Sequence, residues 1–112
     1  MKVVNLSENN TLFNSFIREL RDVNIQNDRM RFRRNLERIG EVIAYELSKE
    51  LPYEKVEVTT PLGTCSETVI AEQPVLATIL RAGLPLHIGL LNYFDQADNS
   101  FISAYRKHSS EE

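Results

Sequence analysis

The feature that most constrains this chain is a short apolar run followed by a polar loop and a helical pattern. Residues 75–80 form a nearly continuous apolar run of strand length, which is typical of a strand buried on both faces. Residues 81–84 interrupt the run, and Pro85 stands where the first turn of a helix tolerates proline. Leucines follow at helical spacing, and residues 100–105 have the composition of a second strand. Strand, helix and strand over about thirty residues predict a βαβ unit with parallel strands and a right-handed crossover.

The N-terminal half of the chain has the apolar spacing of two helices. A short stripe lies within residues 13–20 and a longer one within residues 32–51, in steps of three and four that keep one helix face apolar. Residues 9–11 are candidate N-caps for the first helix, and Asp28 is a candidate for the second. Pro52 is expected to stop the second helix. This half is therefore predicted to be helical.

Between these two parts the sequence predicts a polar β-hairpin. Residues 54–60 alternate apolar and polar side chains, as a half-exposed strand does. Pro61-Leu62-Gly63 is a turn signal, because proline presets its backbone angle and glycine accepts positive φ. Residues 64–70 then read as the returning strand. Such a hairpin cannot fill a core alone, so we expect it to project as an arm, and projecting arms usually contact a partner subunit.

Residues 1–112 are expected to form a single, partial α/β domain. Within it, residues 1–52 form the helical part, residues 53–72 the hairpin arm and residues 73–106 the βαβ unit. Two parallel strands do not make an independent sheet. The parallel sheet is thus expected to be incomplete, with more strands following residue 112 or supplied by another chain.

Composition excludes several classes of protein. The chain is 42% hydrophobic and 26% charged, which suits a soluble globular domain. Its net charge of −3 argues against nucleic acid or an anionic membrane as the main partner. The single cysteine, Cys65, excludes an intramolecular disulfide and a cysteine-rich zinc site, and it fits a reducing cytoplasm. No stretch approaches the roughly 20 apolar residues of a membrane span.

Two arginines are predicted to lie at the edge of the sheet where ligands bind. Arg81 follows the first parallel strand, and Arg106 is expected to end the second. In open α/β sheets, ligands bind outside the carboxyl ends of the strands. The loop also leads into a helix start, which favours an anion, and Gly83 lets the backbone approach a ligand. Guanidinium binds phosphate in a bidentate fork, so the pattern favours a phosphate or pyrophosphate site. The alternative is that the arginines pair with carboxylates at the edge of the core.

Several segments resemble the uracil phosphoribosyltransferase family in their order and spacing. They are Met30-Arg31-Phe32-Arg33-Arg34, Thr59-Thr60-Pro61-Leu62-Gly63, Pro74-Val75, Ile79-Leu80-Arg81-Ala82-Gly83-Leu84 and Ala104-Tyr105-Arg106. The Leu-Arg-Ala-Gly-Leu motif is fairly specific when a Tyr-Arg pair follows at this distance. The resemblance covers essentially the whole chain and implies a phosphoribosyltransferase-like α/β fold.

The resemblance also implies an activity and a set of substrate contacts. The family is a glycosyltransferase family of UMP salvage, which converts uracil and phosphoribosyl pyrophosphate into UMP and pyrophosphate. By similarity, Arg81, Ala82, Gly83 and Leu84 form the nucleotide-binding loop for phosphoribosyl pyrophosphate, and Arg106 contacts the same substrate. Mg²⁺ is expected to arrive with that substrate, and no residue is assigned a catalytic or metal-ligating role. The family further implies a non-proline cis peptide in this loop and a cytoplasmic location. The projecting hairpin, in turn, predicts a homodimer or a higher homo-oligomer.

The resemblance leaves two alternatives open. The family's ribose-phosphate loop and its uracil-binding C-terminal segment do not occur in these 112 residues, so this chain carries only the pyrophosphate-side residues. We therefore do not expect it to catalyse the reaction by itself. The first alternative is a non-catalytic dimerisation or assembly fragment of the same fold. The second, weaker alternative is an RNA-binding regulator.

Other reactive or charged residues have plainer interpretations. His87 is expected to be a polar surface residue, and His108 to be solvated in the polar tail. Cys65 is expected to be small and half-buried, without a nucleophilic role. The arginines between positions 29 and 38 favour a solvated face or subunit contact over a nucleic-acid site, because they surround a helix with an apolar face.

Overall fold

The computed structural model describes residues 1–107, so the prediction for His108 lies outside the described residues. The elements follow in the order α1 (Leu12–Arg21), α2 (Arg29–Ser48), β1 (Tyr53–Thr60), β2 (Gly63–Ile70), β3 (Val75–Leu80), α3 (Leu84–Tyr93) and β4 (Asp98–Ser103). This order confirms the predicted mixed α/β fold, with N-terminal helices, a hairpin arm and one βαβ unit. The division into a single domain with three parts stays a prediction.

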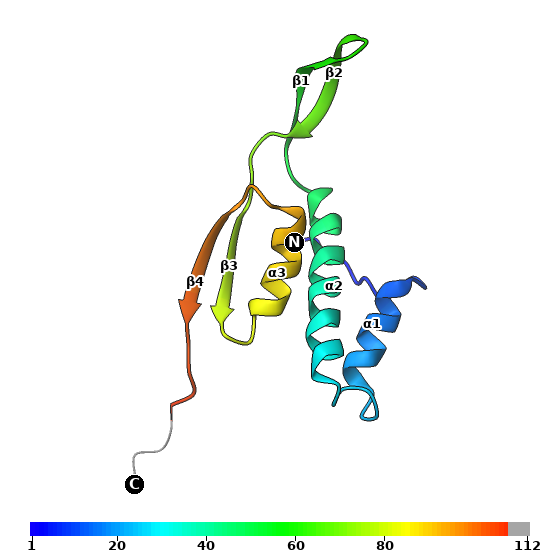
Figure 1. The fold of residues 1–112 in the computed structure, drawn as a ribbon, viewed down its shortest axis with the longest axis vertical. Coiled ribbons are helices and arrows are strands. Elements are labelled where there is room, and N and C mark those ends of the chain that lie inside the picture. The colour runs from blue at the N-terminus through cyan, green and yellow to red at the C-terminus, as the bar shows by residue number, and fades with distance from the viewer. Residues whose placement is uncertain (108–112) are drawn as a thin grey trace.

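The elements are stacked in layers beside a small parallel sheet. β3 and β4 pair in parallel, with Val75 opposite Asp98 and Leu80 opposite Ser103. α3 lies against β3, α2 packs on α3, and α1 packs on the outer side of α2 (Figure 1). The core lies between α2, α3 and the sheet, where Ala44, Leu76, Phe94 and Ala97 are buried together. The βαβ unit is therefore held in place by the N-terminal helices.

Both N-terminal helices begin at the residues that their sequences predict. The Thr11 hydroxyl accepts a hydrogen bond from the Phe13 amide at 3.2 Å, and the Asp28 carboxylate accepts one from the Arg31 amide at 3.1 Å. Each cap satisfies an amide that has no partner within its helix. Within residues 1–107, no helix is both long enough and apolar enough to cross a bilayer.

α2 ends before Pro52, and it is shorter than the apolar stripe that reaches residue 51 predicts. The last helical residue is Ser48, and the amides of Lys49 and Glu50 bond to carbonyls three residues back. These tighter bonds close the helix with a short turn. The Ser48 carbonyl accepts hydrogen bonds from the Tyr53 hydroxyl at 2.7 Å and from the Leu51 amide at 3.4 Å, so it has partners outside the helix.

β1 and β2 form an arm that projects from the rest of the molecule. Their register pairs Tyr53 with Ile70 at the base and Thr60 with Gly63 at the tip. Gly63 has φ of +134°, a backbone conformation that glycine adopts without steric cost. Because the arm stands away from the helices, the long axis measures 69 Å and the radius of gyration is 18.6 Å, against about 13 Å for a compact domain of this length (Figure 1).

Among the described residues, the parallel sheet is covered on one face, so the predicted burial of β3 on both faces is not seen in this part of the chain. Leu76 is 8% exposed, whereas Val75 and Ile79 on the opposite face are 66% and 58% exposed. α3 covers the first face, and no described element covers the second. Phe101 and Ile102 of β4 are also more than half exposed. The apolar side chains of β3 are thus buried on the face toward α3 and exposed on the other face within residues 1–107.

Candidate functional site

The loop after β3 begins at the carboxyl edge of the parallel sheet. Leu80 is the last residue of β3 and lies opposite Ser103, the last residue of β4. The arrowheads of both strands in Figure 1 point toward this same edge. The two segments that leave the sheet here, one starting at Arg81 and the other containing Arg106, are therefore adjacent at their origins. This edge is where open α/β sheets bind ligands.

The loop is held by three backbone hydrogen bonds. The Gly83 amide donates to the Ile79 carbonyl at 3.1 Å, and the Leu84 amide donates to the Arg81 carbonyl at 3.1 Å. The His87 amide donates to the Gly83 carbonyl at 3.0 Å and closes the first turn of α3. The loop is consequently a short, bonded turn between the end of β3 and the start of α3.

Gly83 is required by close packing and not by its backbone angles. Its φ of −77° and ψ of −7° lie in the ordinary right-handed region, which any residue can adopt. A Cβ at this position would meet the Thr78 hydroxyl and would lie 2.9 Å from the Ile79 carbonyl oxygen. Only a residue without a side chain allows the loop to fold back this closely on β3.

Arg81 projects from this loop on an exposed position. The peptide bond between Leu80 and Arg81 is cis, so the non-proline cis peptide implied by the family resemblance is present. Within residues 1–107, neither Arg81 nor Arg106 forms an ion pair or a side-chain hydrogen bond. The alternative in which these arginines pair with carboxylates at the edge of the core is therefore not seen in this part of the chain.

Arg106 does not end a strand, so that prediction is wrong. β4 covers Asp98–Ser103, which starts and ends earlier than the predicted residues 100–105. The physical reason is the length of β3. After Leu80 the chain turns into the loop, so β3 provides no partner for the described residues beyond Ser103. Arg106 lies in the exposed, irregular segment that follows β4.

The start of α3 offers fewer backbone donors than a free helix N-terminus. The amides of Gly83 and Leu84 are used inside the loop, and Pro85 in the first turn has no amide hydrogen. Among the described residues, the amides of Ala82 and Leu86 have no backbone partner. An anion at this edge would thus depend mainly on arginine side chains, with a smaller share from these two amides.

His87 is buried, so its prediction as a surface residue is wrong. Its side chain is 4% exposed, and its Nε2 lies 2.6 Å from Asn99 Oδ1 of β4. Its ring also packs against Phe101, with 5.0 Å between the ring centroids. The helical spacing places His87 on the face of α3 that meets the sheet, which the polarity of the residue alone does not indicate.

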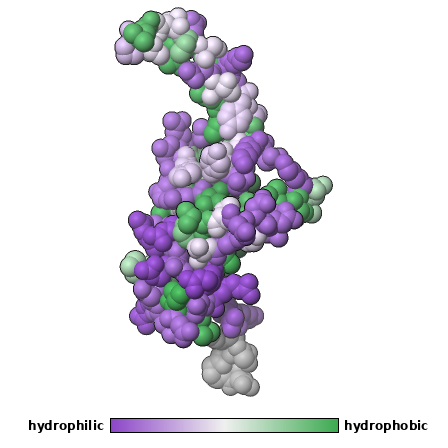
Figure 2. All heavy atoms as spheres, turned by 90° about the vertical axis from the view of Figure 1, so that its right-hand side faces the viewer, coloured by the Kyte–Doolittle hydropathy of each residue, from purple (hydrophilic) through white to green (hydrophobic). Residues whose placement is uncertain are grey.

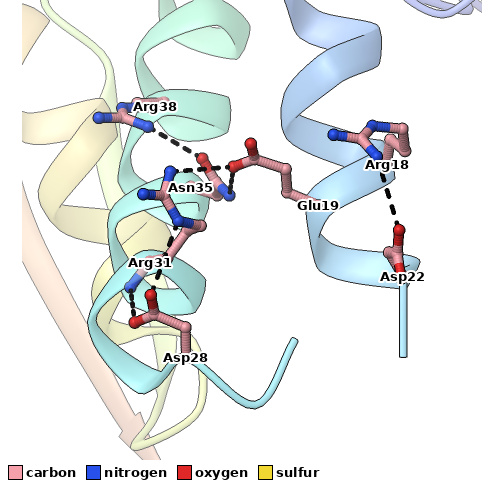
Figure 3. A network of polar contacts seen from close by, with 7 residues as sticks. All are labelled: Arg18, Glu19, Asp22, Asp28, Arg31, Asn35 and Arg38. Atoms are coloured by element: carbon pink, nitrogen blue, oxygen red, sulfur yellow. Dashed lines mark hydrogen bonds and ion pairs between the residues drawn. The ribbon is translucent and has the colours of Figure 1, made fainter. Parts of the chain in front are cut away.

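The arginines of α2 are partly used within the chain. Arg31 lies near both Asp28 and Glu19, and Arg38 donates to the fully buried Asn35 at 3.1 Å (Figure 3). Arg34 pairs with Glu37 at 2.9 Å, while Arg29 and Arg33 are exposed. The face of the molecule on the α1 side is mostly hydrophilic (Figure 2). These contacts agree with a solvated, intramolecularly paired face.

Glu19 of α1 links this network to α2. Its carboxylate accepts a hydrogen bond from Asn35 Nδ2 at 2.8 Å and lies 3.5 Å from the Arg31 guanidinium (Figure 3). The hydrogen bond from Asn35, supported by the positive charges of Arg31 and Arg18, holds the pKa of Glu19 below its ordinary value of 4.5, against an opposing effect of burial. The network therefore joins the two N-terminal helices most strongly when Glu19 is ionised.

Two further predictions concern Cys65 and metals. Cys65 is exposed and not half-buried, because both faces of the arm meet solvent at its position in β2. Its thiol lies 3.6 Å from a carboxylate oxygen of Glu67. Among residues 1–107, no three histidine, cysteine, aspartate or glutamate side chains gather as a metal-ligand group.

Known proteins resemble this chain over most of its length. The family model described as uracil phosphoribosyltransferase matches residues 7–112. A uracil phosphoribosyltransferase of Porphyromonas gingivalis is 57% identical over 108 residues, which cover 96% of this chain and 50% of that protein. One from Methanococcus vannielii is 39% identical over 88 residues, covering 77% of this chain and 38% of that protein.

A solved structure, that of the AQ2163 protein from Aquifex aeolicus, has a similar fold. It matches with a TM-score of 0.75 and 30% identity over 88% of this chain and 46% of that chain. The chain thus spans about half the length of the curated relatives it matches most fully. The extent of the family match and the identity to these relatives show that the chain belongs to the uracil phosphoribosyltransferase family.

Proposed function

We propose that the protein of this chain is a uracil phosphoribosyltransferase of pyrimidine salvage. In the proposed reaction, uracil N1 forms a bond to C1′ of phosphoribosyl pyrophosphate, and the bond from C1′ to the pyrophosphate oxygen breaks. Uracil loses its N1 proton, and the products are UMP and pyrophosphate. The observation that carries the proposal is the Arg81 loop at the carboxyl edge of the sheet, in a chain of this family.

Arg81 and Arg106 are proposed to bind the pyrophosphate of the substrate, with Ala82, Gly83 and Leu84 forming the loop backbone. Negative charge builds on the departing pyrophosphate as the ribose gains positive charge. Arginines that are already in place lower the free energy of that transition state. Mg²⁺ is proposed to enter as part of the magnesium complex of phosphoribosyl pyrophosphate, keeping several waters. The ribose phosphate and uracil would be recognised by residues other than these.

Calorimetry with magnesium and phosphoribosyl pyrophosphate on the whole protein tests this site. Replacing Arg81 by alanine should weaken binding by more than about tenfold, because a charge-assisted hydrogen bond contributes about 1.5–3 kcal/mol. Arg33→Ala is the matched control, since it removes the same charge from an exposed position on α2. Equal affinities of the wild type and Arg81→Ala would contradict the assignment.

We further propose that the protein forms a homodimer or a higher homo-oligomer through the hairpin arm. The arm projects from the helices and presents two unpaired strand edges, which readily pair with another chain. Deleting residues 56–67 and closing the shortened hairpin with Asn-Gly should shift the sedimentation of the protein toward the monomer. An unchanged oligomer after this deletion would contradict the role of the arm.

The same experiments address the alternative of a non-catalytic assembly protein. An oligomer that depends on the arm, without any binding of phosphoribosyl pyrophosphate, would favour assembly over catalysis. A cytoplasmic location is part of our proposal, and the presence of a single, unpaired cysteine supports a reducing compartment.

A further inference from the structure

His87 is a buried titratable residue that the proposed binding of substrate does not use. It lies in the first turn of α3, and only 4% of its surface is exposed. Its Nε2 lies 2.6 Å from Asn99 Oδ1. Because an amide oxygen can only accept, Nε2 carries the hydrogen and donates it to Asn99. The side chain thus bonds α3 directly to β4.

The backbone of His87 makes a second connection, toward the arginine loop. Its amide donates to the Gly83 carbonyl at 3.0 Å, and the Gly83 amide in turn donates to the Ile79 carbonyl at 3.1 Å. The loop that carries Arg81 is therefore bonded to β3 at one end and to His87 at the other. His87 is the point where this series of bonds meets β4.

Asn99 belongs to the strand that leads to Arg106. It pairs with Leu76 in the register of the parallel sheet, and Phe101 of the same strand packs against the ring of His87. A movement of the start of α3 relative to β4 would consequently change the separation of the two arginine-bearing segments. Among the described residues, the hydrogen bond from His87 to Asn99 and the ring contact with Phe101 join α3 directly to β4 and oppose that movement.

We propose that His87 is a positioning residue, whose hydrogen bond to Asn99 holds the start of α3 on β4 and so sets the placement of the Arg81 loop relative to the segment of Arg106. The side chain acts through the loop and does not touch the substrate. The expected effect of His87 on catalysis rests on the proposed function, whereas the expected effect of His87 on the placement of the loop is independent of that function.

Variants separate the hydrogen bond from the packing of the ring. His87→Phe keeps an aromatic ring against Phe101 and removes the donor. His87→Gln supplies an amide N–H in place of Nε2–H and should restore much of the bond. Asn99→Ala removes the acceptor at an exposed position, so it tests the same bond if His87→Phe does not fold. Ile39→Val, in the buried face of α2, is the control for a general loss of stability.

The first experiment is amide hydrogen exchange without any ligand. Under native conditions, the Gly83 amide should exchange about tenfold faster in His87→Phe and in Asn99→Ala than in the wild type, because the hydrogen bond between His87 and Asn99 no longer opposes opening of the loop. In His87→Gln, the Gly83 amide should exchange at close to the wild-type rate. In Ile39→Val, exchange of the Gly83 amide should change no more than exchange of the other amides. Equal effects of His87→Phe and Ile39→Val at Gly83 would overturn the inference.

The second experiment uses steady-state kinetics of the whole protein. His87→Phe should raise the KM for phosphoribosyl pyrophosphate by about tenfold and leave the KM for uracil nearly unchanged, since only the arginine segments move. His87→Gln should restore the KM. A wild type with no transferase activity but with the expected exchange pattern would reject the proposed function and keep the positioning role. An active wild type whose kinetics and exchange do not respond to His87→Phe would reject the positioning role alone.

Discussion

Gly89 of α3 and Gly40 of α2 face each other where the two helices cross, and a Cβ on Gly89 would lie 3.0 Å from the Gly40 Cα. The same Cβ would also meet the carbonyl oxygen of Glu37 on α2. The two helices therefore pack backbone against backbone. Through this contact, α2 supports the helix that follows the Arg81 loop.

Gly89→Ala should destabilise the protein, although alanine is the better helix former. Alanine in place of glycine within a helix normally stabilises it by about 0.5–1 kcal/mol. Here the added methyl group would overlap the Glu37 backbone, and overpacking of this kind costs about 1–3 kcal/mol. Urea unfolding should therefore show a lower midpoint. Ser15→Ala, on the exposed face of α1, is the control, and a raised midpoint for Gly89→Ala would contradict the close crossing.

Gly63→Ala should affect the arm and spare the helices. A Cβ on Gly63 would meet no atom within 4 Å, so the cost comes only from its φ of +134°. A residue with a side chain in such a conformation costs about 1–3 kcal/mol. Amide exchange in β1 and β2 should become faster, while exchange in α2 stays unchanged because the arm makes few contacts with that helix. Equal changes in the arm and in α2 would mean that the two unfold together.

Gly83→Ala should weaken the binding of magnesium pyrophosphate by more than about tenfold with a smaller effect on the stability of the fold. The backbone angles of Gly83 suit alanine, so the effect is steric: the methyl group would meet Thr78 and the Ile79 carbonyl. The loop must then move away from β3. The double variant Thr78→Ala with Gly83→Ala should recover part of the affinity, because one of the two obstructing atoms is removed. Calorimetry measures both variants, and unchanged affinity in Gly83→Ala would contradict the tight packing of the loop.

Acid should weaken the contact between α1 and α2 through Glu19. Its pKa is lowered in the folded state by the hydrogen bond from Asn35 and by Arg31, so its stabilising effect is complete above the ordinary value of 4.5. This effect is lost as the pH falls through the lower pKa of the folded state. Urea midpoints measured from neutral pH to about pH 3 should therefore fall more steeply in the wild type than in Glu19→Gln. Glu57→Gln on the arm is the control, and parallel curves for the wild type and Glu19→Gln would contradict the role of the network.

The start and end of several elements could be predicted from neighbouring residues. Thr11 and Asp28 cap their helices as predicted, since a cap needs only a side-chain oxygen beside the first free amides. β3 covers residues 75–80 as predicted, and the turn before Gly63 lies where Pro61 and Gly63 indicate. These features depend on interactions within a few residues.

The candidate site was predicted in part. The Arg81 loop lies at the carboxyl edge of the sheet, as the strand–loop–helix pattern indicates. The position of Arg106 and the burial of His87 could not be predicted in this way, because they depend on pairing with β3 and on packing against β4. The one available signal for the burial of His87 was the helical spacing, which places it on the side of α3 that faces the sheet.

The sequence by itself determined the local elements and the loop that carries Arg81, since caps, turns and apolar spacing act between residues close in the chain. Tertiary structure decided which faces are covered and where strands end. β4 stops at Ser103 because β3 provides no partner beyond Leu80, and Val75 stays exposed because α3 covers only the opposite face. Pairing and burial depend on residues far apart in the sequence, so no local pattern specifies them.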